Sequence, residues 1–233
     1  MLGHRGARRR APENTLAAFE LSRKEGADGV ELDVRLDAAH AVVVFHDATL
    51  ERMTEGRDAR SVERLSATER ARVELVGERI PTLADVLDWA RRHDQRVNVE
   101  LKRDVRERRV FVNAVARLLQ REPPERIVLS SFDPMLVRAL AQRLPALPVA
   151  WLVHAKQRVL RFAPGYRLLG AVGVHPEAPL ATPKRVARLH RAGAFVNVWT
   201  VNEGARAQKL AAAGVDAIIT DVPAEILQAL STG

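Results

Sequence analysis

Short apolar runs alternate with amphipathic helical segments along almost the whole chain. In the helical segments, apolar residues recur three or four positions apart, as at Leu83, Val86 and Leu87. Strands linked by such segments pair in parallel, because a parallel crossover needs about a dozen residues or more. Eight apolar runs are predicted as strands: Leu2–His4, Gly29–Val34, Val97–Leu101, Ile127–Ser131, Val149–Val153, Ala171–His175, Phe195–Thr200 and Ala217–Thr220.

Capping residues mark where several of the helices begin. Thr82 with Asp85 three residues later has the form of a capping box. Asp133 and Thr182 each precede a proline, the preferred residue at the first helical position. Eight strands with intervening helices predict a (β/α)8 TIM barrel, formed by residues 1–233 as a single domain. A doubly wound open sheet is the alternative architecture.

One interval breaks the alternation. Residues 41–46 have the pattern of a strand, but they follow the second predicted strand too closely for a parallel crossover. We therefore expect an antiparallel hairpin, with its turn centred on Ala38 and Ala39, which places His46 directly opposite Glu31 on the same face. Residues 48–80 then form a polar, charged insertion. We expect a small cap over one rim of the barrel, with an irregular excursion as the alternative.

Three carboxylates fall near the ends of predicted strands, where barrels of this type carry their active sites. Glu31 and Asp33 are two residues apart on one strand and therefore point to the same face. Glu100, on the next parallel strand, points at the same mouth. Three crowded carboxylates repel one another unless a cation lies between them. The pattern predicts a site for one divalent cation, Mg²⁺ or Ca²⁺, with a salt-bridged rim without an ion as the alternative.

Two histidines accompany these carboxylates. His4 ends the first strand and His46 ends the hairpin, so they are candidates for a general acid and base. One would take a proton from an attacking hydroxyl or water, and the other would protonate the departing alkoxide. Arg5 and Lys102 are candidates to bind phosphate oxygens, or alternatively to neutralise the carboxylates. His175, at the end of another strand, is a candidate substrate-binding residue.

These residues lie in motifs that closely resemble glycerophosphodiester phosphodiesterases, and the resemblance covers essentially the whole chain. It implies a TIM barrel that hydrolyses glycerophosphodiesters to glycerol 3-phosphate and an alcohol. It also implies His4 and His46 as acid and base, a Ca²⁺ or Mg²⁺ site at the three carboxylates, and Phe132 and Trp199 as pocket aromatics. The motifs are His4-Arg5-Gly6, Pro12-Glu13-Asn14-Thr15, Glu31-Leu32-Asp33-Val34, His46-Asp47, Val99-Glu100-Leu101-Lys102, Ser130-Ser131-Phe132-Asp133, Val198-Trp199-Thr200-Val201-Asn202 and Gly214-Val215-Asp216-Ala217.

Two other functions stay open at this point. Cleavage of lysophospholipids of the phospholipase D type would use the same residues with an acyl chain in the pocket. A non-catalytic barrel that binds phosphorylated ligands or nucleic acid would explain the net charge of +8. The scattered arginines and an aromatic fraction of 4% argue against a nucleic-acid groove, so no nucleic-acid partner is expected.

Composition and the lengths of the apolar runs restrict the kinds of site and the location that the sequence allows. The chain has no cysteine, which excludes disulfides and thiolate metal sites. No apolar run approaches the length of a membrane span. The His-Arg motif comes too early to leave room for a signal peptide, so a cytoplasmic protein is expected. The partner expected is a small-molecule glycerophosphodiester, and the sequence leaves the oligomeric state open.

Overall fold

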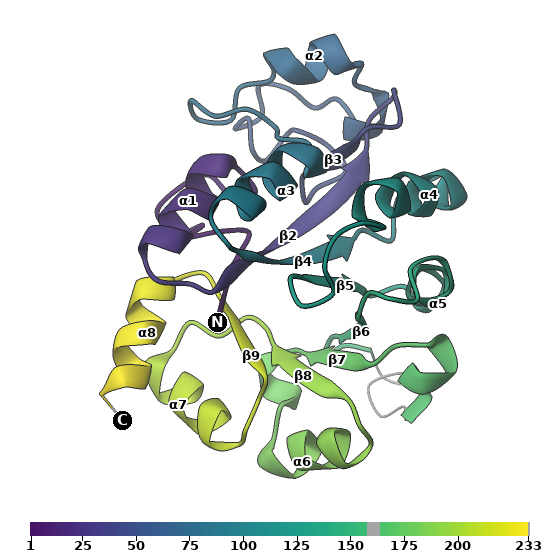
Figure 1. The fold of residues 1–233 in the computed structure, drawn as a ribbon. Helices are drawn as coiled ribbons and strands as arrows, with labels where there is room; N and C mark the ends of the chain where they lie inside the picture. Colours follow the sequence, from purple (N-terminus) through teal and green to yellow (C-terminus); the bar gives the residue numbers. More distant parts are fainter. Residues whose placement is uncertain (158–163, 233) are drawn as a thin grey trace.

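The strands form a closed parallel barrel with helices around it, a TIM barrel, as the alternation of elements predicts (Figure 1). The structure is a computed structural model that describes residues 1–157 and 164–232. Eight strands follow one another in the order β1-β9-β8-β7-β6-β5-β4-β2, and pairing of β1 with β2 closes the ring. The open-sheet alternative is therefore wrong.

The predicted strands are present with small changes at their ends. For example, the strand expected at Phe195–Thr200 ends at Val198, and the one expected at Ala171–His175 begins at Gly173 and ends at Pro176. The strands are β1 Leu2–His4, β2 Gly29–Leu36, β3 Val42–Val44, β4 Arg96–Leu101, β5 Ile127–Ser131, β6 Val149–Val153, β7 Gly173–Pro176, β8 Phe195–Val198 and β9 Ala217–Thr220.

The helices begin where the sequence offers capping groups. Thr15 accepts a hydrogen bond from the Ala18 amide at the start of the first helix, and Thr82 and Asp85 form the predicted capping box. The α-helices are α1 Leu16–Lys24, α2 Ala67–Arg72, α3 Leu83–Arg92, α4 Arg108–Leu119, α5 Pro134–Arg143, α6 Pro183–Arg191, α7 Gly204–Ala212 and α8 Pro223–Ser231. Short 3₁₀ turns are η1 Val62–Arg64, η3 Pro164–Leu169 and η4 Ala178–Leu180.

Alternation along β2 separates the core from the site. Val30, Leu32 and Val34 are fully buried in the apolar cluster that also contains residues of the surrounding helices. The residues between them, Glu31 and Asp33, therefore point to the opposite face, the barrel interior. The apolar side chains thus anchor the strand while the carboxylates remain inside.

The hairpin forms, but its predicted register is wrong by one residue. β3 pairs antiparallel with β2 so that Val34 faces Val44 and Leu36 faces Val42. Continued in this register, the residue opposite Glu31 is Asp47 rather than His46. The turn contains one residue more than expected, because His40 adopts a positive φ of 59° and Asp37 accepts hydrogen bonds from the amides of Ala39 and Ala41.

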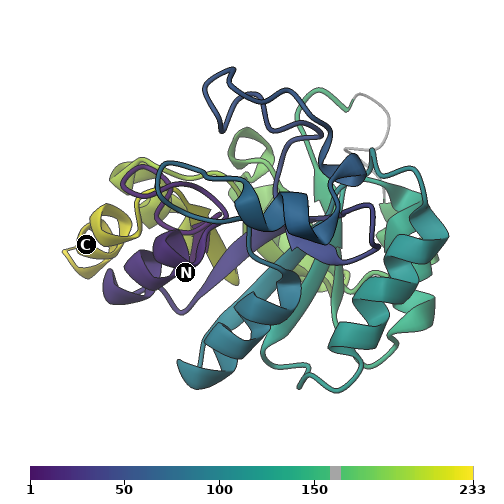
Figure 2. The ribbon, with the colours of Figure 1, turned by 90° about the horizontal axis from the view of Figure 1, so that it is seen from above.

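Residues 48–80 contain η1 and α2 and lie beyond β3 in Figure 1. Figure 2 shows their dark-blue loops standing clear of the helices around the barrel. The segment shares a small apolar cluster with the outer face of β3, separate from the main core. Its buried members are Val43, Phe45, Leu50, Val62, Leu65, Val73, Leu75 and Ile80.

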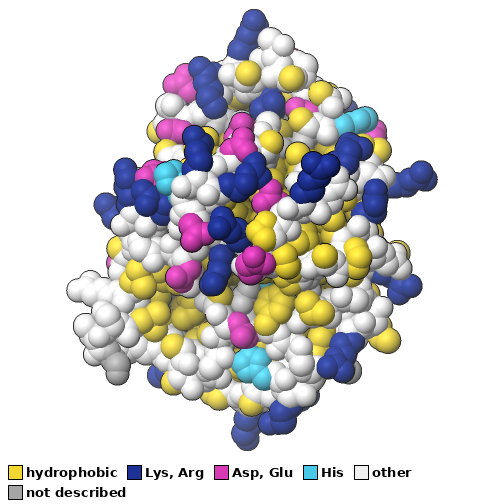
Figure 3. Space-filling model, viewed as in Figure 1, with side chains coloured by type: hydrophobic (Ala, Val, Ile, Leu, Met, Phe, Trp, Pro, Cys, Tyr) yellow, Lys and Arg dark blue, Asp and Glu magenta, His cyan; other side chains and the backbone are white. Residues whose placement is uncertain are grey.

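On the face drawn in Figure 3, basic side chains are scattered, with acidic ones among them. Within residues 1–157 and 164–232, no helix combines the length and apolar character needed to cross a membrane.

Candidate active site

Strand register brings the three predicted carboxylates together. Glu31 lies beside His4 in the β1–β2 pair, and Asp33 lies beside Glu100 in the β2–β4 pair. An oxygen from each of Glu31, Asp33 and Glu100 lies within 4.8 Å of the others. All three side chains are buried.

Two cations neutralise part of this charge. Lys102 Nζ lies 2.8 Å from a Glu100 oxygen and 3.2 Å from an Asp33 oxygen. Arg5 Nε lies 3.0 Å from the other Asp33 oxygen. The side-chain amide of Asn14 donates to Asp33 at 2.9 Å. Asp33 therefore contacts more cationic and hydrogen-bond-donating side chains than Glu31 or Glu100 does.

The pKa values of the three carboxyl groups shift in different directions, because the cationic side chains contact them unequally. Burial alone would raise the pKa of Asp33, but Lys102 and Arg5 outweigh it and hold that pKa well below its usual range. The pKa of Glu31 is raised well above its usual range by burial and by the neighbouring Asp33 and Glu100 carboxylates. Burial also raises the pKa of Glu100, although Lys102 opposes this shift. A cation bound among the three would relieve the repulsion that these shifts reflect.

His4 forms a pair with a carboxylate from the far end of the chain. Its Nδ1 lies 2.6 Å from Asp221 Oδ1. Burial alone would raise the pKa of Asp221, but the hydrogen bond from His4 and other partners lower it to about 2, so the group is ionised. An ionised carboxylate only accepts hydrogen bonds, so Nδ1 carries the proton. Nε2 is then left for a substrate, 3.9 Å from Glu31.

His46 forms a second pair of the same kind. It lies just beyond β3, and its Nδ1 is 2.6 Å from Asp47 Oδ1. The backbone carbonyl of His46 accepts a hydrogen bond from Arg35 Nε at 2.9 Å, which fixes the loop. Burial lowers the pKa of His46, and Lys102 and Arg5 lower it further, although the Asp33 charge and the hydrogen bond to Asp47 oppose this shift. The net shift favours the neutral imidazole.

A cavity of about 240 Å³ joins these groups. A second cavity of about 590 Å³ adjoins it and shares His46, Lys102 and Phe132 with it. The Phe132 and Trp199 rings meet edge to face at 5.3 Å on the wall. The first cavity is lined by His4, Arg5, Glu31, His46, Asn98, Glu100, Lys102, Phe132, Leu152, His154, Trp199 and Ile219.

His175 does not line either cavity. Its side chain is completely buried inside the barrel, where Nε2 lies 3.1 Å from the side-chain amide nitrogen of Asn197. Its backbone carbonyl accepts a hydrogen bond from Trp199 Nε1 at 2.8 Å. The structure therefore places His175 behind the Trp199 side of the pocket wall, outside the lining of both cavities.

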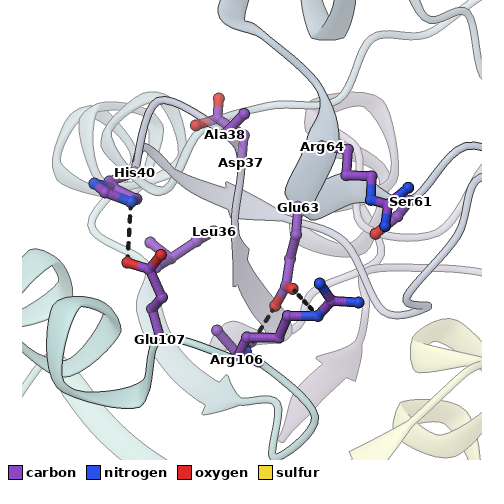
Figure 4. Close-up of a pocket in the computed structure, with 10 residues that line it drawn as sticks. Leu36, Asp37, Ala38, His40, Ser61, Glu63, Arg64, Arg106 and Glu107 are labelled. Carbon is purple, nitrogen blue, oxygen red and sulfur yellow. Dashed lines mark hydrogen bonds and ion pairs between the residues drawn. The ribbon is translucent and has the colours of Figure 1, made fainter.

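A separate cavity beside the hairpin turn is drawn in Figure 4. Four of its charged residues contact one another in two pairs. His40 Nε2 lies 3.1 Å from Glu107, and Glu63 accepts a hydrogen bond from the Arg106 amide at 3.1 Å. It contains none of the carboxylates or histidines described above.

Several residues of the site are not identified by sequence reasoning. Glu13 and Asp221 bind side chains around the cavity, and Asp47 orients His46. Asn98 lies on the cavity wall, 1% exposed, and both polar atoms of its side chain lack a partner within the described residues. Alternation along β4 places Asn98 on the same face as Glu100, and this pattern could have identified Asn98 from the sequence.

Comparison with known proteins agrees with the fold. The model of the glycerophosphoryl diester phosphodiesterase family matches residues 4–225. A glycerophosphodiester phosphodiesterase of Caldanaerobacter subterraneus is 30% identical, with 100% of this chain and 98% of the relative covered. A phosphodiesterase of Oleispira antarctica, solved in complex with sn-glycerol-3-phosphate, is 26% identical with a TM-score of 0.87, covering 99% and 96% of the two chains. The glycerophosphodiester phosphodiesterase of Thermotoga maritima has a TM-score of 0.80 at 26% identity, covering 97% and 96%. The chain therefore belongs to the glycerophosphoryl diester phosphodiesterase family.

Proposed function

We propose that this chain hydrolyses glycerophosphodiesters to glycerol 3-phosphate and an alcohol, with a divalent cation and with His4 and His46 as acid and base. The observation that carries the proposal is the arrangement around one cavity. Two imidazoles, each with Nδ1 on a carboxylate, line the same space as a buried carboxylate cluster. This is the equipment needed to move two protons beside a charged phosphorus centre.

Glu31, Asp33 and Glu100 would hold the cation, either Mg²⁺ or Ca²⁺. Among the described residues, the three buried carboxylates share two cationic side chains, Arg5 and Lys102, and oxygen donors suit a hard ion. When bound, the ion supplies Lewis-acid stabilisation of the charge that develops on the phosphate oxygens.

The residues of the chain supply the proton transfers. One imidazole accepts at Nε2 the proton of the attacking hydroxyl, which belongs either to the glycerol moiety or to water. The other imidazole donates a proton from Nε2 to the departing alkoxide. Asp221 stabilises the imidazolium form of His4 and Asp47 that of His46, because each carboxylate accepts the Nδ1–H of its own histidine.

Other lining residues bind and orient the substrate. Arg5 and Lys102 border the cavity and place positive charge beside the phosphate. Phe132 and Trp199 give it an apolar wall against the carbon atoms of the substrate. Attack by the glycerol hydroxyl would form a cyclic phosphate, which ³¹P NMR of the reaction mixture would detect.

The test is an assay of glycerophosphocholine, glycerophosphoethanolamine and a lysophospholipid, with Mg²⁺ or Ca²⁺ and with EDTA. We expect metal-dependent release of glycerol 3-phosphate, reduced roughly 10²–10⁴-fold in His46→Ala. His40→Ala is the matched control, because His40 lies at the hairpin turn outside the cavity. Turnover of the lysophospholipid alone would favour the phospholipase D-type activity, and nucleic-acid binding without turnover would favour a non-catalytic barrel.

A further inference from the structure

Glu13 lies at the centre of a network of three arginines. Its carboxylate accepts from Arg5 Nη1 at 2.9 Å, from Arg8 Nη1 at 3.1 Å, and from Arg52 Nη2. The Glu13 side chain is only 9% exposed. Arg5 and Arg8 follow β1, whereas Arg52 comes from the segment after β3, so Glu13 joins two separate parts of the chain.

Each of the three arginines also forms an ion pair through Nε with a second carboxylate, and for Arg52 this contact is also a hydrogen bond. Arg8 Nε lies 2.7 Å from Asp221, which holds His4. Arg52 Nε lies 2.6 Å from Asp47, which holds His46. Arg5 Nε lies 3.0 Å from Asp33 of the buried cluster. Glu13 is therefore two contacts away from each histidine–carboxylate pair.

A guanidinium group is planar, with its N–H donors in a fixed fork. When Nη binds Glu13 and Nε binds a second carboxylate, the separation of the two carboxylates is set by that plane. Removing Glu13 would free one side of both Arg8 and Arg52 at once. Asp221 and Asp47 would then no longer be connected to each other through arginines that both bind Glu13.

We propose that Glu13 is a positioning residue that holds both histidine–carboxylate pairs in place through Arg8 and Arg52. The inference rests on the proposed function, in which His4 and His46 act as acid and base. Glu13 itself does not line the cavity and has no direct contact with either imidazole. A packing role alone would leave the two imidazoles undisturbed when the charge of Glu13 is removed.

The first measurement is the kinetics of Glu13→Gln with glycerophosphocholine. We expect kcat to fall about tenfold or more, because charge-assisted hydrogen bonds are lost, while KM stays within about twofold. Glu122→Gln is the matched control: Glu122 is also 9% exposed at its side chain and pairs with one arginine, Arg91, away from the cavity. Equal kinetics for the two variants would overturn the proposal.

The second measurement is independent of turnover. NMR of histidine side chains labelled with ¹⁵N reports the Nδ1–H resonance of each imidazole. We expect Glu13→Gln to shift the resonances of both His4 and His46, Arg8→Lys to shift only that of His4, and Arg52→Lys only that of His46. Unchanged resonances in Glu13→Gln, or a shift at one histidine alone, would overturn the proposal.

These two measurements separate the inference from the function on which it rests. If the wild-type chain fails to release glycerol 3-phosphate, the proposed function is wrong. The Nδ1–H resonances of His4 and His46 in Glu13→Gln would still test whether Glu13 positions the two histidines. If Glu13→Gln does not fold, Arg52→Lys provides the test, because the Arg52 side chain is 51% exposed and a lysine there keeps the charge. An unchanged His46 resonance in that variant would overturn the proposal.

Discussion

His175 should make the fold sensitive to acid, and His175→Gln should remove part of that sensitivity. Burial lowers the pKa of His175 to about 3, and no charged partner opposes it. Nε2 faces the side-chain amide nitrogen of Asn197, a donor, so Nε2 accepts and has no room for a proton. Protonation in the folded state would place two donors against each other.

The magnitude follows from the difference between the folded and unfolded chains. At pH 5 an unfolded histidine with a pKa of 6.5 is almost fully protonated, whereas His175 in the fold is still neutral. The unfolded state therefore binds more protons, and stability is present above pH 6.5 and is lost as the pH falls toward the folded pKa. Between pH 7 and pH 5 this single group costs about 2 kcal/mol of unfolding free energy.

Urea unfolding at pH 7 and at pH 5 measures the effect. The wild-type chain should lose about 2 kcal/mol more than His175→Gln over this interval, whatever the difference between the two proteins at pH 7. His4 and His46 titrate in both proteins and cancel in the comparison. His40→Gln, which removes an exposed imidazole at the hairpin turn, is the matched control. An equal loss in wild type and His175→Gln would show that His175 is protonated normally in the fold, and the reasoning would be refuted.

Three further outcomes are expected. Millimolar Mg²⁺ or Ca²⁺ should raise the Tm relative to EDTA, by the equivalent of about 2.7 kcal/mol when the ion is at 100 times its Kd. Asp33→Asn should abolish that rise, and a rise that persists in this variant would contradict the proposed metal site. Leu65→Ala, in the apolar cluster of residues 43–80, should lower the unfolding free energy by about 3 kcal/mol in chemical denaturation, whereas Leu168→Ala, at an 80% exposed residue, should change it by less than about 0.5 kcal/mol. Asn98→Leu should raise KM for glycerophosphocholine about tenfold, because the partnerless amide is suited to a substrate hydroxyl, and leave turnover of bis(4-nitrophenyl) phosphate unchanged; equal effects on both substrates would argue against that contact.

The barrel could be predicted because its signals are local. Each strand is a short apolar run, and several helices begin at a cap such as Thr82. Placement of Glu31, Asp33 and Glu100 at one mouth needed only alternation along two neighbouring parallel strands. That reasoning remains correct when a strand end moves by a residue or two, as it does at β8.

The hairpin and the charge network could not be predicted in the same way. The register of β3 depends on the conformation of a single turn residue, His40, whose positive φ adds one residue to the loop. Asp221 reaches His4 only because the barrel closes, across a separation of 217 residues. Arg52 reaches Glu13 through an irregular segment with no periodic pattern. Contacts of this kind follow from the three-dimensional path of the chain rather than from local preference.

The hydrogen bond between His4 and Asp221 spans the first strand and the end of the last. The two residues meet because β9 lies beside β1 in the closed ring. A chain whose last strand has not joined the ring would carry both histidines and the whole carboxylate cluster, yet His4 would lack its Asp221 partner. The His4–Asp221 pair therefore forms only with closure of the barrel.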